Sequence, residues 1–269
     1  MAQPKPIALV TGATSGIGLE FARQLAAGGH DLVIVARDTA RLERVADELN
    51  STYAAHAETL PADLAQRTQL QRVADRLADP DRPVDVLVNN AGFALKGQFL
   101  QNDVADEERH LDVLVLAVLV LSHAAARAMS TRGRGRIVNV SSVAGFLTSG
   151  TYSAAKAWVT TFTEGLATEL AGTGVTATAL CPGFTHTEFH QRSGIRRDST
   201  PGFMWLEARR VVADALADVE KGRVLSVPGP QYKAVVGLLR VMPRSLVRSR
   251  ARTLRRSGSG GESSGSGGH

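Results

Sequence analysis

A chain of 269 residues with 43% hydrophobic and 21% charged residues has the size of one α/β domain with a full core. Its net charge of +5 comes from seven arginines between residues 240 and 256, because residues 1–239 hold 24 basic and 25 acidic side chains. A nearly neutral body excludes the basic footprint of a nucleic-acid-binding protein. The single cysteine, Cys181, excludes an intrachain disulfide and favours a reducing compartment.

The chain enters an apparent strand by Ile7, which leaves no room for a secretory signal. Its longest apolar run, 113–121, has nine residues, whereas a membrane-spanning helix needs about 20. We therefore expect a cytoplasmic protein without a transmembrane segment.

Short apolar segments alternate with longer helical ones along the first 230 residues. The pattern predicts strands at 7–11, 31–36, 54–60, 84–89, 136–141, 175–181 and 223–227, and helices at 16–28, 39–50, 65–78, 105–130, 152–171 and 206–220. Strands such as 7–10 and 32–35 are continuous apolar runs, which is typical of strands covered on both faces. We predict an α/β, doubly wound Rossmann fold, in which helices flank both faces of a seven-stranded parallel sheet.

Three regions follow from this pattern. Residues 1–230 are the predicted catalytic domain, and they include an irregular connection at 185–206 that is typical of a lid. Residues 231–256 form a basic C-terminal extension, predicted to be a helix broken near Pro243. The Gly/Ser-rich stretch 257–269 is predicted to be a disordered tail.

A glycine-rich turn follows the first strand and opens the first helix. Glycines in such a turn let the backbone approach a pyrophosphate, whose charge meets the N-terminus of the helix. The spacing G-x-x-x-G-x-G predicts a dinucleotide-binding turn formed by Gly12, Ser15, Gly16, Ile17 and Gly18.

The residue after the second strand bears on the choice of coenzyme. An acidic residue there would bind the ribose hydroxyls of NAD, whereas Arg37 suits the 2′-phosphate of NADP. We predict NADP over NAD, although the neighbouring Asp38 weakens this argument and a surface arginine is the alternative reading.

Two further segments end at the carboxyl edge of the predicted sheet, where ligands bind in such folds. Asp63 and Leu64 close the third strand and could reach the adenine ring; a helix N-cap is the alternative for Asp63. Asn90, Ala91 and Gly92 follow the fourth strand and are predicted to line the coenzyme site.

Tyr152 and Lys156 are four residues apart and should lie one turn apart on the same face of a helix. A free phenol has a pKa near 10. A lysine cation about 4 Å away, at an effective dielectric of about 20, would favour the phenolate by roughly 4 kcal/mol, or about three pKa units. This predicts a Tyr152 pKa near neutrality, where acid–base catalysis is most efficient.

Five motifs in this order resemble the short-chain dehydrogenase/reductase family, and the resemblance extends from Ile7 to about Gly229. They are Thr-Gly-x-x-x-Gly-x-Gly at 11–18, Asn-Asn-Ala-Gly at 89–92, Asn-Val-Ser-Ser at 139–142, Tyr-x-x-x-Lys at 152–156 and Cys-Pro-Gly at 181–183. The family implies an NADP-dependent oxidoreductase that reversibly reduces a ketone to a secondary alcohol.

The resemblance also implies roles for individual residues. Tyr152 would protonate the carbonyl oxygen, Lys156 would lower its pKa and hold the nicotinamide ribose, and Ser142 would hydrogen-bond the substrate oxygen. Ser141 is the alternative to Ser142, because strand alternation turns only one of the pair inward. The wall and anchor of the nicotinamide would be Pro182, Gly183, Thr185 and Thr187.

Two features depart from the family pattern. Leu114 stands where the family usually has an asparagine that supports a water-linked proton relay, and Ser142 precedes Tyr152 by only ten residues, which should shorten one wall of the pocket. The alternative to an active enzyme is therefore a catalytically weakened nucleotide sensor or scaffold on the same fold.

The remaining features concern ligands and partners. His186 and His190 lack a third ligand, so no metal site is expected. Cys181 reads as a core residue. The apolar 111–121 segment predicts a core helix, and the family implies a homodimer or homotetramer through it. The arginine-rich extension reads as a solvated face, with an acidic lipid surface or carrier protein as alternatives. An apolar ketone or alcohol substrate is predicted from Phe93, Leu95, Phe146, Phe184, Phe189, Met204 and Trp205.

Overall fold

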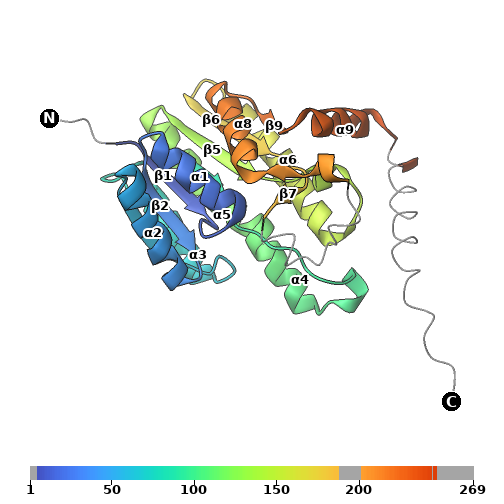
Figure 1. Ribbon diagram of the computed structural model, residues 1–269, viewed down its shortest axis with the longest axis horizontal. Coiled ribbons are helices and arrows are strands. Elements are labelled where there is room, and N and C mark those ends of the chain that lie inside the picture. The colour runs from blue at the N-terminus through green and yellow to red at the C-terminus, as the bar shows by residue number, and fades with distance from the viewer. Residues whose placement is uncertain (1–4, 188–200, 244, 247–269) are drawn as a thin grey trace, which may run out of the picture.

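The computed structural model describes residues 5–187, 201–243 and 245–246. At its centre lies a seven-stranded parallel sheet with the strand order β3-β2-β1-β4-β5-β6-β9 (Figure 1). This confirms the predicted doubly wound fold. The strands are β1 (Ile7–Thr11), β2 (Asp31–Ala36), β3 (Ala57–Pro61), β4 (Val84–Asn89), β5 (Gly135–Val140), β6 (Val175–Leu180) and β9 (Leu225–Ser226).

Helices cover both faces of the sheet and enclose two apolar clusters. One face carries α1 (Gly16–Ala27), α2 (Thr39–Tyr53) and α8 (Ala208–Glu220); the other carries α3 (Arg67–Ala78), α5 (Ala117–Arg132) and α6 (Gly150–Glu169). The apolar spacing explains the packing: α3 buries Leu70, Val73, Ala74 and Leu77, a stripe with helical periodicity.

Two predicted strands are shifted. The third begins at Ala57 rather than residue 54, because α2 continues to Tyr53 and Ala54 caps it in the left-handed region (φ 51°). The last is limited to Leu225–Ser226, which pairs with the end of β6. The other described strands and helices lie within a few residues of their predicted ranges.

The predicted helix at 105–130 is three consecutive segments. These are α4 (Val104–Leu111), the π-helical turn η2 (Asp112–Leu116) and α5. Together, Val104–Arg132 are long and apolar enough to cross a membrane by length and composition alone, but half of the most apolar window is buried inside the fold. Ala117, Leu121 and Ala125 pack against the sheet, so the helix serves as a core element here.

The elements near the C-terminus lie at the two ends of the predicted lid and at the outer end of the sheet. β7 (Thr185–His186) pairs with β8 (Leu206–Glu207) at the two ends of the predicted lid, and α9 (Pro230–Val241) lies beside β9 at the outer end of the sheet (Figure 1). Shorter turns are η1 (Phe99–Gln101), η3 (Val143–Phe146) and η5 (Gly202–Met204). Residues 188–200 of the lid, 247–256 of the extension and the tail 257–269 lie outside the described residues.

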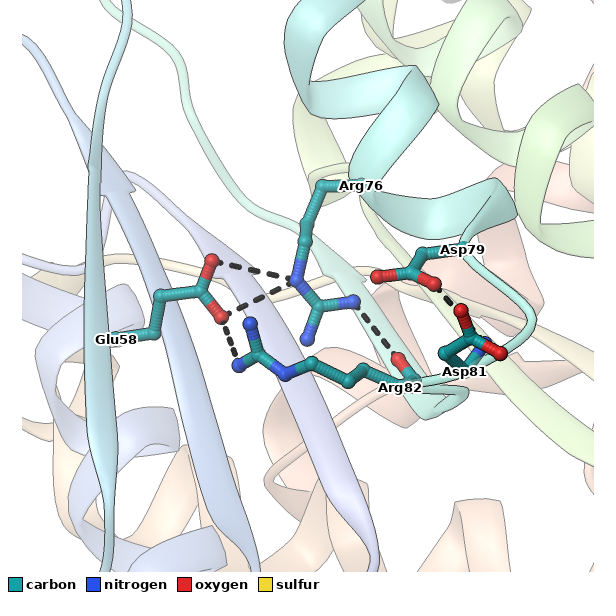
Figure 2. Close-up of polar contacts among 5 residues, drawn as sticks. All are labelled: Glu58, Arg76, Asp79, Asp81 and Arg82. Atoms are coloured by element: carbon teal, nitrogen blue, oxygen red, sulfur yellow. Dashed lines mark hydrogen bonds and ion pairs between the residues drawn. The ribbon is translucent and has the colours of Figure 1, made fainter.

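An ion cluster ties the edge strand β3 to α3, away from the site (Figure 2). Arg76 of α3 donates from Nε to Glu58 of β3 at 3.1 Å, and Arg82 donates from Nη2 to the same carboxylate at 2.5 Å. Arg76 also donates to the Arg82 carbonyl at 2.8 Å. Because the Arg76 side chain is only 9% exposed, this carboxylate compensates a largely buried charge.

Candidate active site

The glycine-rich turn leaves β1 and enters α1 in the conformation that the sequence predicts. Gly12 and Gly16 have φ values of 66° and 55°, which favour glycine. A β-carbon on Gly12 would lie 2.9 Å from Asn90 Nδ2. Asn90 holds the turn by donating from Nδ2 to the Thr11 carbonyl at 2.9 Å. Position 12 therefore requires glycine, both for its positive φ and because the turn packs closely against Asn90 and Ala91.

One cavity of about 700 Å³ brings the predicted coenzyme and catalytic residues together at the carboxyl edge of the sheet. Its lining includes every predicted site residue except Gly18: Gly12, Ser15, Gly16, Ile17, Arg37, Asp63, Leu64, Asn90, Ala91, Gly92, Ser142, Tyr152, Lys156, Pro182, Gly183, Thr185 and Thr187. These residues come from the loops and helices that follow six different strands, and the parallel topology is what brings them to one edge.

Gly18 is the one predicted site residue that does not line this cavity. It is buried in the first turn of α1, and a β-carbon there would collide with the Asn90 amide and the Gly12 carbonyl. Gly18 therefore permits close packing of the helix behind the turn.

Two arginines border the end of the cavity that follows β2. Arg37 is exposed, and Asp38 turns away from it to cap α2 by accepting a hydrogen bond from Arg41 N at 3.0 Å. Arg41, which the sequence analysis missed, lines the cavity and donates from Nη2 to the Thr14 carbonyl at 3.2 Å. Asp38 therefore serves as the N-cap of α2, and the charged side chains of Arg37 and Arg41 lie beside the cavity.

Asp63 lies at the cavity but is not an N-cap of α3, which is capped by Gln66. Its carboxylate accepts from Ala65 N at 3.1 Å and pairs with Arg109 Nη2 of α4 at 2.6 Å. The N-cap alternative is therefore wrong, because Gln66 occupies the N-cap position of α3. The Asp63 carboxylate instead links the loop after β3 to α4.

The two serines after β5 face opposite ways. Ser141 is 2% exposed and donates to the Lys156 carbonyl at 2.7 Å, inside the contact between β5 and α6. Ser142 accepts from Ala144 N at 3.1 Å and shares a hydrogen bond with the Tyr152 side chain. Ser142 is therefore the hydroxyl that accompanies Tyr152, as the alternation argument predicts.

Tyr152 and Lys156 lie in the first half of α6, but their electrostatics differ from the prediction. Lys156 Nζ donates to the Val140 carbonyl at 2.7 Å and lies 5.8 Å from the centroid of the Tyr152 ring. Burial raises the pKa of Tyr152 to about 12, although the hydrogen bond with Ser142 acts to lower it. Burial also lowers the pKa of Lys156 to about 8.

The predicted Tyr152 pKa near neutrality is therefore wrong for this structure. A phenolate loses its hydration inside the protein, and this cost, which the spacing of the two residues does not reveal, is the largest contribution to the Tyr152 pKa here. At neutral pH the phenol is protonated and Lys156 is mostly charged.

Leu114 lies in the π-helical turn η2, where the Ala117 N–H reaches back to the Asp112 carbonyl. Its side chain is fully buried, and a β-carbon on Gly92 would lie 2.8 Å from Leu114 Cδ2. Such π-turns are frequent at functional sites. The backbone is therefore widened at Leu114, where the resemblance leads us to expect a departure from the family pattern.

His110, one turn before Leu114, is a neighbour of Tyr152 that the sequence did not reveal. Its Nε2 donates to the Phe93 carbonyl at 3.0 Å, and its ring stacks 6.1 Å from the Tyr152 ring. Burial lowers the pKa of His110, so the ring is neutral at pH 7. No spacing signal in the sequence links positions 93, 110 and 152.

The predicted apolar residues divide between the cavity and the structure beside it. Phe93 lines the cavity together with Val113. Phe146, Phe184 and Met204 pack against a third apolar cluster formed by Cys181, Val227, Tyr232 and Val236. Cys181 is fully buried, which confirms the core reading. Phe189 lies outside the described residues.

His186 lies in β7, which pairs with β8. Its ring stacks 4.9 Å from that of Trp205, and its Nε2 lies 3.7 Å from Glu207 Oε1. Among the described residues, no group of three potential metal-binding side chains comes together. His190 lies outside the described residues.

A glycine turn and a serine–tyrosine–lysine set that share one cavity in a doubly wound sheet define a nicotinamide-nucleotide-dependent oxidoreductase. The "short chain dehydrogenase" family profile matches residues 6–198. Galactitol 2-dehydrogenase (L-tagatose-forming) of Cereibacter sphaeroides is 36% identical over 240 residues, which cover 82% of this chain and 93% of that protein.

Two solved structures are similar over nearly the whole chain. A short-chain dehydrogenase from Sphingobium yanoikuyae in complex with NADPH has a TM-score of 0.80 and 33% identity, covering 97% of this chain and 98% of the other. The bulky-bulky ketone specific alcohol dehydrogenase from Comamonas testosteroni has a TM-score of 0.75 and 27% identity, with 97% of each chain covered. The chain belongs to the short-chain dehydrogenase/reductase family.

Proposed function

We propose that this oxidoreductase uses NADPH to reduce an apolar ketone to a secondary alcohol, with Ser142, Tyr152 and Lys156 as the catalytic residues. The observation that carries the proposal is their presence in the same cavity as the glycine-rich turn and Arg37. The reaction needs a proton donor, a group that orients the carbonyl and a bound hydride donor, and this cavity can accommodate all three.

The residues of the cavity suit the coenzyme. The glycine-rich turn at Gly12 and Gly16 would hold the pyrophosphate, and Arg37 and Arg41 would bind the 2′-phosphate that distinguishes NADP from NAD. The bound nicotinamide would supply the hydride that the carbonyl carbon accepts. NADPH in the similar Sphingobium yanoikuyae structure supports this choice of coenzyme.

The protonation states favour carbonyl reduction at neutral pH. With a pKa of about 12, Tyr152 carries the proton that the carbonyl oxygen needs. Ser142, which shares a hydrogen bond with Tyr152, would bind the same oxygen and align it with the phenol. Lys156 would keep a positive charge beside the developing oxyanion and hold the nicotinamide ribose.

The substrate proposal rests on the wall of the cavity nearest to Tyr152. Phe93 and Val113 provide apolar surface there, and burial of such surface contributes roughly 25 cal/mol per Å². The similar Comamonas testosteroni enzyme is specific for bulky ketones. We therefore propose a ketone with an apolar substituent as the substrate class.

We also propose that the protein is a cytoplasmic homodimer or homotetramer that pairs through α5 and α6. On these helices Leu119 is 40% exposed, and the Trp158 and Phe162 rings stack with centroids 4.7 Å apart. Light scattering after size-exclusion chromatography tests this assembly, and a monomer at micromolar concentration would contradict it.

The catalytic proposal is tested by following NADPH at 340 nm with a panel of aliphatic, aromatic and cyclic ketones. We expect turnover by the wild type and at least a 100-fold lower kcat for Tyr152→Phe. Tyr53→Phe, the same chemical change at the end of α2, serves as the matched control and should keep full activity. Tight NADPH binding without turnover across the panel would refute catalysis and support the nucleotide-sensor alternative.

A further inference from the structure

Tyr232 belongs to the C-terminal extension by sequence, but it lies directly behind Gly183, which lines the active-site cavity. It lies in the first turn of α9, is 2% exposed, and packs with Cys181, Val227 and Val236. Phe184, Met204 and Leu206, from the two ends of the lid, pack against the same cluster. The beginning of the extension therefore packs directly behind the turn that follows β6.

The Tyr232 hydroxyl connects the two ends of the lid. It accepts a hydrogen bond from Phe184 N at 2.9 Å and donates one to the Met204 carbonyl at 2.6 Å. A phenol hydroxyl can donate one hydrogen bond and accept others, and Tyr232 acts here both as a donor and as an acceptor. Phe184 and Met204 flank the paired strands β7 and β8, so the Tyr232 oxygen adds a link between them to the strand pairing and to the bond from Leu206 N to the Phe184 carbonyl at 2.8 Å.

The ring of Tyr232 supports the turn that lines the nicotinamide end of the cavity. A β-carbon on Gly183 would collide with the Tyr232 ring, so ring and backbone are in direct contact. Pro182, Gly183 and Thr185 of this turn line the cavity. The position of the turn therefore depends on a side chain that does not itself line the cavity.

The other end of α9 is fixed to the catalytic helix and to the turn after Ser142. Arg240 donates from Nη2 to Glu164 of α6 at 2.8 Å, and its guanidinium lies 5.7 Å from the centroid of the Phe146 ring in η3. Because both ends of α9 contact the rest of the domain, the helix holds Tyr232 against Phe184 and Met204.

We propose that Tyr232 is a positioning residue, whose hydroxyl fixes the Pro182–Thr185 turn and both ends of the lid for binding of the nicotinamide half of the coenzyme and of the ketone. The inference rests on the proposed function for the identity of these ligands. Gly12 and Arg37 would hold the adenosine half of the coenzyme, and neither residue contacts Tyr232, so binding of that half should not depend on Tyr232.

Tyr232→Phe tests this proposal because it removes the hydroxyl and keeps the ring on Gly183. Loss of one hydrogen bond to the Phe184 amide should accelerate its hydrogen exchange about tenfold, measured by mass spectrometry on peptides spanning 182–187. The Kd of NADPH should rise about tenfold, whereas the Kd of 2′,5′-ADP, which lacks nicotinamide, should change less than twofold. The KM of the ketone should rise while kcat stays within about threefold.

Tyr53→Phe is the matched control and should change none of these values. Unchanged exchange and binding in Tyr232→Phe would overturn the proposal, as would an equal loss of affinity for NADPH and 2′,5′-ADP with a lower Tm, which indicates general destabilisation. Exchange and binding are measured without turnover. An inactive wild type that still shows both effects would therefore refute the proposed ketone reduction and leave the role of Tyr232 supported.

Discussion

The lowered pKa of Lys156 predicts a specific dependence of activity on pH. Lys156 is 5% exposed, and its burial lowers the pKa to about 8. The amine is therefore about 90% protonated at pH 7 and about 10% protonated at pH 9. If the charge on Lys156 is needed for the reaction, kcat/KM for NADPH should fall about tenfold between pH 7 and pH 9.

The quantity to measure is kcat/KM for NADPH, at a saturating ketone concentration, from pH 6 to pH 10. This ratio reports the pKa values of the free enzyme. Tyr152 and Cys181 have pKa values of about 12 and about 11, so neither should titrate in most of this range. We expect activity to fall as pH rises, because the lowered pKa makes Lys156 lose its charge at a lower pH than an ordinary lysine does.

Two variants separate Lys156 from other causes of this pH dependence. Lys156→Met should reduce kcat/KM at pH 7 and give a flat profile around pH 8. Lys221→Met changes an exposed lysine at the end of α8 and should keep the wild-type profile. A wild-type profile that stays level to pH 10 would refute the reasoning.

Four other substitutions should have separable effects. Arg41→Gln should raise the Kd of NADPH by about tenfold and leave that of NADH unchanged in a fluorescence titration, because it removes one cation next to the proposed 2′-phosphate site; equal effects on both would contradict this. Gly183→Ala should cost about 1–3 kcal/mol by overpacking against Tyr232, seen as a Tm several degrees lower. Glu58→Gln should destabilise the fold by a similar amount, because it leaves Arg76 buried without its carboxylate. Arg82→Gln changes a half-exposed position and should cost under about 1 kcal/mol. Comparable losses of Tm in the two variants would disprove the assignment of the buried charge to Arg76.

Much of the fold was predictable because its signals are local. Apolar runs, glycine turns and helical stripes each occupy a few neighbouring residues, and the parallel topology then places the ends of the strands at one edge. This is why Gly12, Asn90, Ser142 and Tyr152 share a cavity, as predicted. It is also why alternation could separate Ser142 from Ser141.

Properties that depend on distant neighbours were not predictable. Spacing alone placed Lys156 near Tyr152, but only the packed structure shows that burial dominates their pKa values and that Lys156 donates to Val140. The roles of Arg41 and His110 depend on contacts with Thr14 and Phe93, which no local pattern encodes.

The C-terminal extension shows the same division. Its helix and its arginines can be recognised from the sequence, whereas the place of Tyr232 beneath the lid is fixed by contacts with residues 28 and 48 positions earlier in the chain. The sequence by itself determined the sheet, the glycine-rich turn and the motifs of the proposed catalytic set, because periodicity and glycine conformation act locally. Only the tertiary structure decided solvation, charge state and the support of the lid, because these depend on what surrounds each group in space.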